Sequence, residues 1–254
     1  MNMRSGRNVT LAICCLIAAV AGTTKEIKDG KSVVTAMRER YQESWYATMT
    51  FTQKSTTYNA DGTTKVETWY EAGNLPGKLR IDFGPPSEGN GAILAHGKGF
   101  FFEKGKQTSS RPMINLLLVL GFDVYRQKPE ETLALLEQEG IDVSKFHEDE
   151  WKGEPVYVVG AEKDDLKSTQ FWVEKKRLLF VRLIQPDRHD EKKKDDVRFA
   201  DYRKMPKGFI AARVEVYNNE KLVFTEEYSK IQTDIELEPG VFDPAQFSTA
   251  RWKK

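Results

Sequence analysis

Hydrophobic and polar residues alternate with a period of two along most of this chain. The first clear case is residues 44–53, SWYATMTFTQ, and the pattern recurs in residues 79–83, LRIDF. Alternation rich in aromatic and β-branched residues is typical of a strand with one buried face. The repeated pattern therefore predicts a protein built mainly of β-strands.

Short runs of turn residues separate these strands. NADG at residues 59–62, LPGK at 75–78 and HGKG at 96–99 are examples, and glycine, proline, asparagine and aspartate favour tight reversals. About ten or eleven strands can be counted, one group between residues 44 and 104 and another from residue 155 onward. Because the reversals are short and most strands follow one another directly, we expect an antiparallel meander.

Three segments have a helical pattern instead. In residues 29–42, apolar side chains recur at intervals of four, as an amphipathic helix requires; they are Val33, Met37 and Tyr41, with Val34 beside them. Residues 112–122 and 129–139 each begin with a proline and have a glycine at or near the end. These residues suit the first turn and the C-terminus of a helix, respectively.

A single antiparallel sheet of this length curls rather than staying flat. A full barrel with this number of strands would be wide enough to hold a ligand. One face of the curl would carry a set of large apolar side chains: Trp45, Met49, Phe51, Leu79, Ile81 and Phe83. Alternation alone leaves two possibilities open, a solidly packed interior or a lined cavity.

Residues 1–21 are expected to be a cleaved secretory signal peptide, which leaves residues 22–254 as one domain. Arg4 and Arg7 precede an apolar run at 9–21 that ends in AVA, a small-x-small cleavage site. The protein would then be periplasmic. A membrane anchor is one alternative, although the run is short for a bilayer. Lipidation of Cys14 is another, although the residues before it resemble a lipobox only loosely.

Cleavage would also change the chemistry of the mature chain. It removes both cysteines, at positions 14 and 15, and with them any disulfide or thiolate site. It leaves 37 basic and 38 acidic residues, a formal net charge of −1. A nearly neutral surface argues against nucleic acid as the main partner and provides no attraction to anionic membranes.

No constellation of catalytic or metal-binding residues stands out. The three histidines, His96, His147 and His189, lack metal-ligand spacing, and there is no G-x-S-x-G motif. No two carboxylates share an apolar setting that the sequence makes visible, as glycosidase chemistry would need. We therefore expect a protein that is not an enzyme and that binds no metal or cofactor.

Several short motifs follow one another in a definite order. FTQK at residues 51–54 precedes a DG turn at 61–62, Trp69, PGKLR at 76–80 and HGKGF at 96–100. Residues 151–159 and GVFD at 240–243 complete the series. Over most of residues 30–245, this series resembles the LolA family of periplasmic lipoprotein carriers and outer-membrane lipoprotein-sorting proteins.

The resemblance implies an incomplete β-barrel with a hydrophobic cavity covered by helices that act as a lid. It adds Trp69 to the apolar-face residues as cavity lining. The lid is the apolar run after the aromatic strand: Met113, Ile114, Leu116, Leu117, Leu118, Leu120 and Phe122. The implied cargo is an acyl lipid or lipoprotein, carried by a monomer. The implied partners are inner-membrane release machinery and an outer-membrane acceptor.

Two positions depart from the family pattern. Leu75 stands just before Pro76, where the carriers have an arginine tied to lid opening, and His96 replaces a usual aspartate. A sensor or interaction module of the same fold, regulating a membrane protein, is therefore the alternative to a carrier. A plain core helix is likewise the alternative to a lid at residues 113–122.

Overall fold

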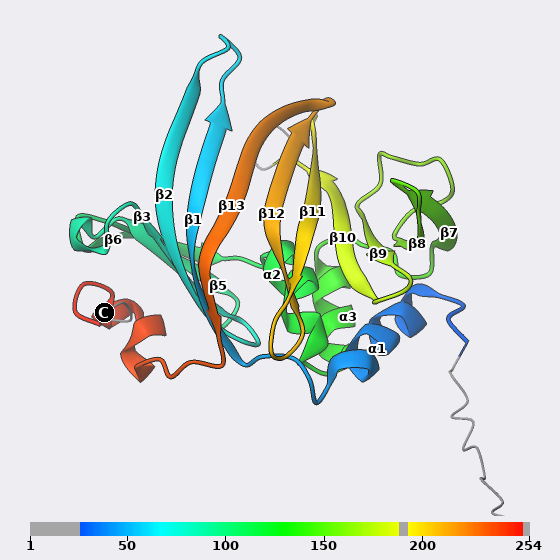
Figure 1. Ribbon diagram of the computed structural model, residues 1–254, viewed down its shortest axis with the longest axis horizontal. Coiled ribbons are helices and arrows are strands. Elements are labelled where there is room, and N and C mark those ends of the chain that lie inside the picture. The colour runs from blue at the N-terminus through cyan, green and yellow to red at the C-terminus, as the bar shows by residue number, and fades with distance from the viewer. Residues whose placement is uncertain (1–25, 188–192, 251–254) are drawn as a thin grey trace, which may run out of the picture.

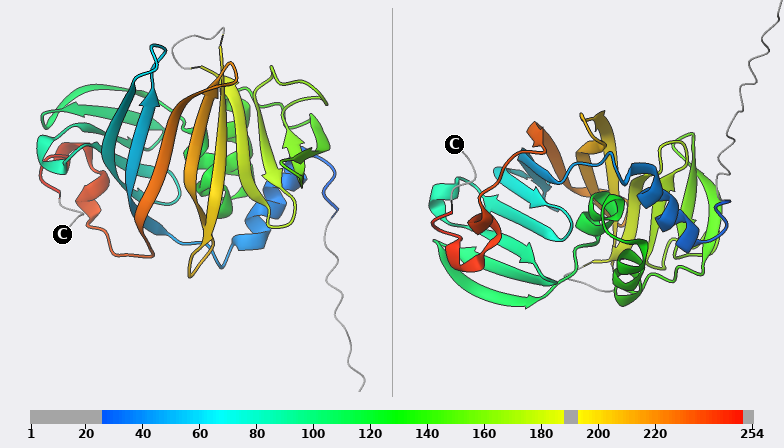
Figure 2. Two further views of the ribbon diagram at one scale, coloured as in Figure 1. Left: turned by 45° about the horizontal axis from the view of Figure 1, so that its top comes forward. Right: turned by 90° about the horizontal axis from the view of Figure 1, so that it is seen from below.

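The protein is a single, strongly curled antiparallel sheet with helices on its concave side (Figures 1 and 2). The computed structural model describes residues 26–187 and 193–250. The expected signal peptide with Cys14, His189 and part of the charged segment around it lie outside these residues. Among the described residues, no helix is both long and apolar enough to cross a membrane.

The sheet contains thirteen strands in the order β6-β5-β4-β3-β2-β1-β13-β12-β11-β10-β9-β8-β7. They are β1 (Thr48–Tyr58), β2 (Thr64–Asn74), β3 (Lys78–Phe83), β4 (Gly91–Ala95), β5 (Lys98–Glu103), β6 (Lys106–Pro112), β7 (Phe146–Trp151), β8 (Glu154–Val159), β9 (Gln170–Glu174), β10 (Leu179–Pro186), β11 (Lys194–Lys204), β12 (Phe209–Asn218) and β13 (Lys221–Thr233). Strands β6 and β7 form the two edges, so the barrel stays open, as the resemblance implies.

Two of these strands were not anticipated, because neither has a regular apolar face. Every residue of β6, KQTSSRP, is exposed, and β7, FHEDEW, has no fully buried residue. Both lie at the sheet edges, where a strand has a neighbour on one side only. Polar edge strands of this kind discourage pairing with other chains.

The helices are α1 (Gly30–Tyr41), α2 (Leu116–Gly121) and α3 (Pro129–Gln138), with short 3₁₀ turns η1 (Pro86–Glu88), η2 (Asp123–Tyr125), η3 (Pro239–Phe242) and η4 (Pro244–Gln246). The first and third helices agree with the expected ranges. Helix α2 is shorter than expected, because Pro112 ends strand β6 instead of starting a helix. Asn115 caps α2, since its side-chain oxygen accepts hydrogen bonds from the N–H groups of Leu117 and Leu118.

The predicted apolar edge of α1 packs into the interior. Val33, Val34, Met37 and Tyr41 are all buried, and the hydroxyl of Tyr41 donates a hydrogen bond to the carbonyl of Arg177, 2.6 Å away. A capping box between Asp29 and Ser32 closes the N-terminus of the helix. In Figure 2, α1, α2 and α3 fill the concave side of the sheet near the strands from β8 to β12.

A different segment covers the convex face. Residues of η3 and η4 pack on the outer side of β2–β5, where Phe247 stacks on Phe102 with ring centroids 4.0 Å apart. Beneath Phe247 lies a buried ion pair between Arg80 and Asp82, 2.9 Å apart, with side chains 3% and 0% exposed. The Arg80 guanidinium also donates to the carbonyl of Phe247, 3.0 Å away. The segment around Phe247 is thereby fastened to β3.

We expect Arg80→Ala to lower the free energy of unfolding by about 3–5 kcal/mol, because it leaves the charge of Asp82 buried without its guanidinium. Lys54→Ala is the matched control. It breaks an ion pair with Glu227 of the same 2.9 Å length, but the two side chains are 58% and 44% exposed. The control should cost less than about 1 kcal/mol. Urea denaturation of the wild type and the two variants measures both values. Equal losses of unfolding free energy would contradict a stabilising role for the buried Arg80–Asp82 pair.

Candidate functional site

A small cavity lies between α2 and the concave face of the sheet. Its volume is about 70 Å³, and we call it the inner cavity. Its walls combine apolar side chains with a few polar ones. The lining residues are Met49, Phe51, Glu71, Leu79, Ile81, Asn115, Leu117, Leu118, Phe122, Phe199, Glu226 and Tyr228. Pockets that hold small-molecule ligands typically measure about 300–1,000 Å³, so this cavity is well below that range.

Strand register explains why these residues meet. Phe51 on β1 stands opposite Glu71 on β2, which stands opposite Ile81 on β3. Residues paired across an antiparallel ladder project from the same face of the sheet. One register step along, Gly73 lies between Met49 and Leu79.

Gly73 makes room for the Met49 side chain. A Cβ at position 73 would lie 2.8 Å from the terminal methyl group of Met49, which is closer than carbon atoms approach. Because Gly73 has no side chain, Met49 can lie flat over β2 and face the cavity.

Residues 113–125, which include the expected lid residues and which we call the lid segment, are fastened at both ends. At its start, the N–H of Met113 donates to the carbonyl of Gly97, 2.9 Å away. At its end, the hydroxyl of Tyr125 accepts a hydrogen bond from the N–H of Phe180, 3.0 Å away. Between these points, Gly121 approaches the ring of Phe199 so closely that a Cβ would lie 2.7 Å from it. In the same stretch, Leu117 and Leu118 of the short helix and the flanking Asn115 and Phe122 line the cavity.

One further hydrogen bond joins the lid segment to the turn after β2. The carboxylate of Asp123 accepts from the N–H of Gly77, 3.0 Å away, and Asp123 is 2% exposed. Burial raises the pKa of Asp123 to about 7, opposed in part by this hydrogen bond. The neighbouring Leu75, which stands where the LolA carriers have an arginine, is buried and apolar. In this chain, the Asp123 side chain of the lid segment accepts a hydrogen bond from the backbone of the turn after β2.

Four polar side chains form what we call the polar floor. Glu71, Glu226 and Tyr228 line the inner cavity, and Gln53 is fully buried opposite Tyr228. The hydroxyl of Tyr228 donates to the carboxylate of Glu226, and the amide of Gln53 donates to Ser55, 2.8 Å away. Burial raises the pKa of Glu226 to about 7. Burial, and then the charge of Glu226, raise the pKa of Glu71 well above its usual value. Two carboxyl groups therefore share a largely apolar setting.

Seven of the fourteen residues proposed from the sequence line the inner cavity: Met49, Phe51, Leu79, Ile81, Leu117, Leu118 and Phe122. Trp69 and Phe83 lie further along the same face, with ring centroids 4.8 Å apart. Trp45 precedes β1 and stacks on Tyr125 at 3.9 Å. The remaining lid residues pack against the core around the cavity: Met113, Ile114, Leu116 and Leu120.

Sequence reasoning missed the polar floor, although a signal for it was present. Glu71 follows Trp69 by two residues, and Glu226 lies midway between Phe224 and Tyr228. Strict alternation puts each glutamate on the same face as its aromatic neighbours. Assigning faces to charged residues as well as apolar ones would have located both carboxyl groups in the interior.

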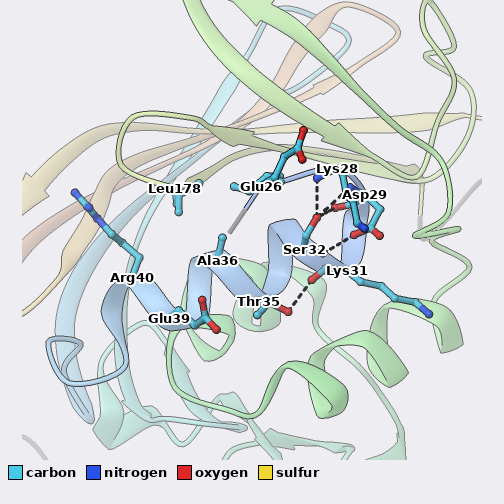
Figure 3. A pocket seen from close by; sticks show the side chains of 11 residues that line it. Glu26, Lys28, Asp29, Lys31, Ser32, Thr35, Ala36, Glu39, Arg40 and Leu178 are labelled. Carbon is cyan, nitrogen blue, oxygen red and sulfur yellow. Dashed lines mark hydrogen bonds between the residues drawn. The ribbon is translucent and has the colours of Figure 1, made fainter. Parts of the chain in front are cut away.

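A larger groove runs along the outer side of α1, beside Leu178 (Figure 3). It has a volume of about 960 Å³ and is lined by residues of both charges, among them Glu39 and Arg40. Several of its polar groups already bond to one another, as the dashed lines from Ser32 and Thr35 show. The apolar residues Ile27, Ala36 and Leu178 lie there among charged groups, whereas most residues that line the inner cavity are large and apolar, so the inner cavity is the better candidate site.

The raised pKa of Asp123 predicts a dependence of stability on pH. Because its folded-state pKa of about 7 exceeds the ordinary value of 3.8, its stabilising contribution is fully present below about pH 4 and is lost as the pH rises through 7. Asp123→Asn, which stays neutral, should therefore become more stable relative to the wild type between pH 4.5 and 8. The upper limit of the gain is about 4 kcal/mol, at 1.4 kcal/mol per pH unit.

Urea denaturation at several pH values measures this difference. Asp164→Asn makes the same chemical change at an exposed turn position with positive φ, which asparagine tolerates, and should leave the pH profile unchanged. Parallel profiles for the wild type and Asp123→Asn would contradict the role of Asp123.

Comparison with known proteins gives no sequence match, either to protein-family models or to curated proteins. Solved structures do match. A DUF1329 family protein from Desulfovibrio piger has a TM-score of 0.56 at 16% identity, covering 86% of this chain and 97% of the other. An outer membrane lipoprotein-sorting protein domain from Vibrio parahaemolyticus has the same TM-score and identity, with 86% and 98% covered.

A LolA superfamily protein from Nitrosomonas europaea has a TM-score of 0.52 at 12% identity, covering 85% of this chain and 98% of the other. In all three cases nearly the whole length of the solved chain is matched. The resemblance drawn from the sequence motifs is confirmed at the level of the fold: this chain has the fold of LolA-superfamily and lipoprotein-sorting proteins.

Proposed function

We propose that this protein is a periplasmic carrier that holds acyl chains of lipids or lipoproteins beneath α2 and moves them toward the outer membrane without a catalytic step. It works as a monomer with the 22–254 segment as its mature domain. It receives cargo from inner-membrane release machinery and passes it to an outer-membrane acceptor. The observation that carries the proposal is the apolar cavity closed by a single short helix.

The energetics of an acyl chain support this function. Burying one methylene group is worth about 0.8 kcal/mol, so a dozen of them contribute roughly 10 kcal/mol. A protein that carries such a chain through water must enclose it. The helix that closes the cavity presents Leu117, Leu118 and Phe122 to it, and an acyl chain could replace these contacts with equivalent ones.

The size of the cavity requires that the lid move. At about 70 Å³, the closed form has room for a few water-sized groups and none for a whole chain. Helix α2 has only six residues, and helices this short have little stability of their own. We infer that α2 shifts while the fastened ends of the lid segment stay in place.

The same small volume favours the second candidate, a periplasmic sensor or interaction module that regulates a membrane protein. In that case the apolar residues under α2 would be an ordinary packed core. The two candidates differ in whether any lipid accompanies the protein.

Native mass spectrometry distinguishes the candidates. The chain would be expressed with its own leader in a Gram-negative bacterium, purified from the periplasm without detergent, and extracted with solvent in parallel. We expect a mass for residues 22–254 plus an excess matched by an extracted acyl lipid. A lipid-free mass that stays unchanged after incubation with lipids and acylated peptides would reject the carrier and leave the sensor.

Substituting the lid provides a second test. Leu117→Glu puts a carboxylate on the cavity wall and should weaken binding of a fluorescent fatty-acid probe at least tenfold, because the open cavity would then contain an unpaired charge. Leu117 is only half-buried in the closed form, so the variant should fold. Leu166→Glu, at a residue that is 52% exposed, is the control. Equal probe binding by both variants would argue against a lid at α2.

A further inference from the structure

When Glu71 and Glu226 are both ionised, the polar floor has more hydrogen-bond acceptors than donors. Its acceptors are then the two carboxylates and the amide oxygen of Gln53. Its donors are the Tyr228 hydroxyl, which donates to Glu226, and the Gln53 amide, which donates to Ser55 and also bonds to Glu226. No lysine, arginine or histidine is among the cavity-lining residues of the described chain.

Two of these acceptors have no partner within the described residues. Gln53 is fully buried, and its amide oxygen receives no hydrogen bond. Glu71 is 6% exposed and lines the cavity, and no side chain of the described chain donates to it. Trp69, which lies cross-strand from Gln53, does not supply the missing donor, since its indole N–H is itself unpaired.

An excess of buried acceptors is costly in free energy. A buried polar group without a partner costs about 1–3 kcal/mol, and more when it is charged. Two carboxyl groups in one apolar site cannot both ionise without a nearby cation. The raised pKa values of Glu71 and Glu226 reflect this cost. A ligand that brought donors and a positive charge would remove it.

A primary ammonium group has the required properties. It is compact, carries a full positive charge and presents three N–H donors with no acceptor. The free volume of about 70 Å³ at the floor admits a group of this size without further opening. An alcohol would bring one donor and no charge, and a carboxylate would add a third negative group.

We propose that the amphiphile bound in this cavity has a primary ammonium head, which lies between Glu71 and Glu226 and donates hydrogen bonds to their carboxylates. The inference rests on the proposed function, since the hydrocarbon part of the ligand takes the space vacated by α2. It adds selectivity, because the cavity recognises the polar head of its cargo as well as the chain.

Calorimetry with three ligands of equal chain length tests the proposal: dodecylamine, dodecyltrimethylammonium and dodecanol, each below its micelle concentration at pH 7. We expect the wild type to bind dodecylamine at least tenfold more tightly than dodecanol, with dodecyltrimethylammonium between them because it has charge but no N–H donor. Dodecylamine should also release a proton from the glutamate pair, seen as heats that vary with buffer ionisation enthalpy.

Isosteric variants locate the effect. Glu71→Gln and Glu226→Gln should each reduce the preference for dodecylamine over dodecanol to within threefold, because each removes one of the two carboxylates that pair with the ammonium group. Glu227→Gln is the matched control. This residue is adjacent to Glu226 but pairs with Lys54 and Arg213 and is 44% exposed. It should keep the full preference.

The outcomes separate this inference from the function on which it rests. Equal affinity for all three ligands would overturn the ammonium site and leave the acyl carrier standing. No binding of any ligand would overturn both. Binding of dodecyltrimethylammonium as tight as that of dodecylamine would overturn the hydrogen-bonded geometry. A preference that survives in Glu71→Gln and Glu226→Gln would place the head group elsewhere.

Discussion

The sheet does not close, and the rest of the structure depends on this. A curled sheet with free edges has a concave apolar face that water would otherwise reach, and burying that face is the main source of stability. Helices α1 and α3 and the turn η2 cover the half formed by β8–β12. Helix α2, with six residues, contacts β10 and also faces β1–β3 and β13 across the inner cavity. The candidate site lies beneath this short helix.

The inner cavity combines two requirements that oppose each other. Apolar walls favour a hydrocarbon chain, whereas the carboxyl groups of Glu71 and Glu226 are stable there only when protonated or matched by a positive charge. In a purely structural core, replacing such groups by apolar ones often raises stability. Their presence under a thin lid is easier to understand if the cavity spends part of its time occupied.

Much of this architecture could be read from the sequence, because period-two alternation assigns each strand residue to one face. Met49, Phe51, Leu79 and Ile81 share the concave face for that reason. The edge strands β6 and β7 could not be read, since an edge strand with exposed side chains has no alternation to detect. Trp45 was assigned to a strand that begins three residues later, at Thr48. The alternation of Trp45 with Met49 begins before Thr48, where the strand starts. Whether an apolar face encloses space depends on packing across the sheet, which no local pattern records.

The pairing of β1 with β13 has a consequence for how the chain folds. These neighbouring strands lie at the centre of the sheet, yet Thr52 and its hydrogen-bonded partner Ser229 are 177 residues apart. Contacts between such distant residues form slowly, because a long loop must close first. Until β13 pairs with β1 and β12, each half of the sheet is a meander with an extra free edge. That edge is β1 in one half and β12 in the other. The folding chain therefore passes through a stage with four exposed strand edges instead of two, when pairing with other chains is the main hazard.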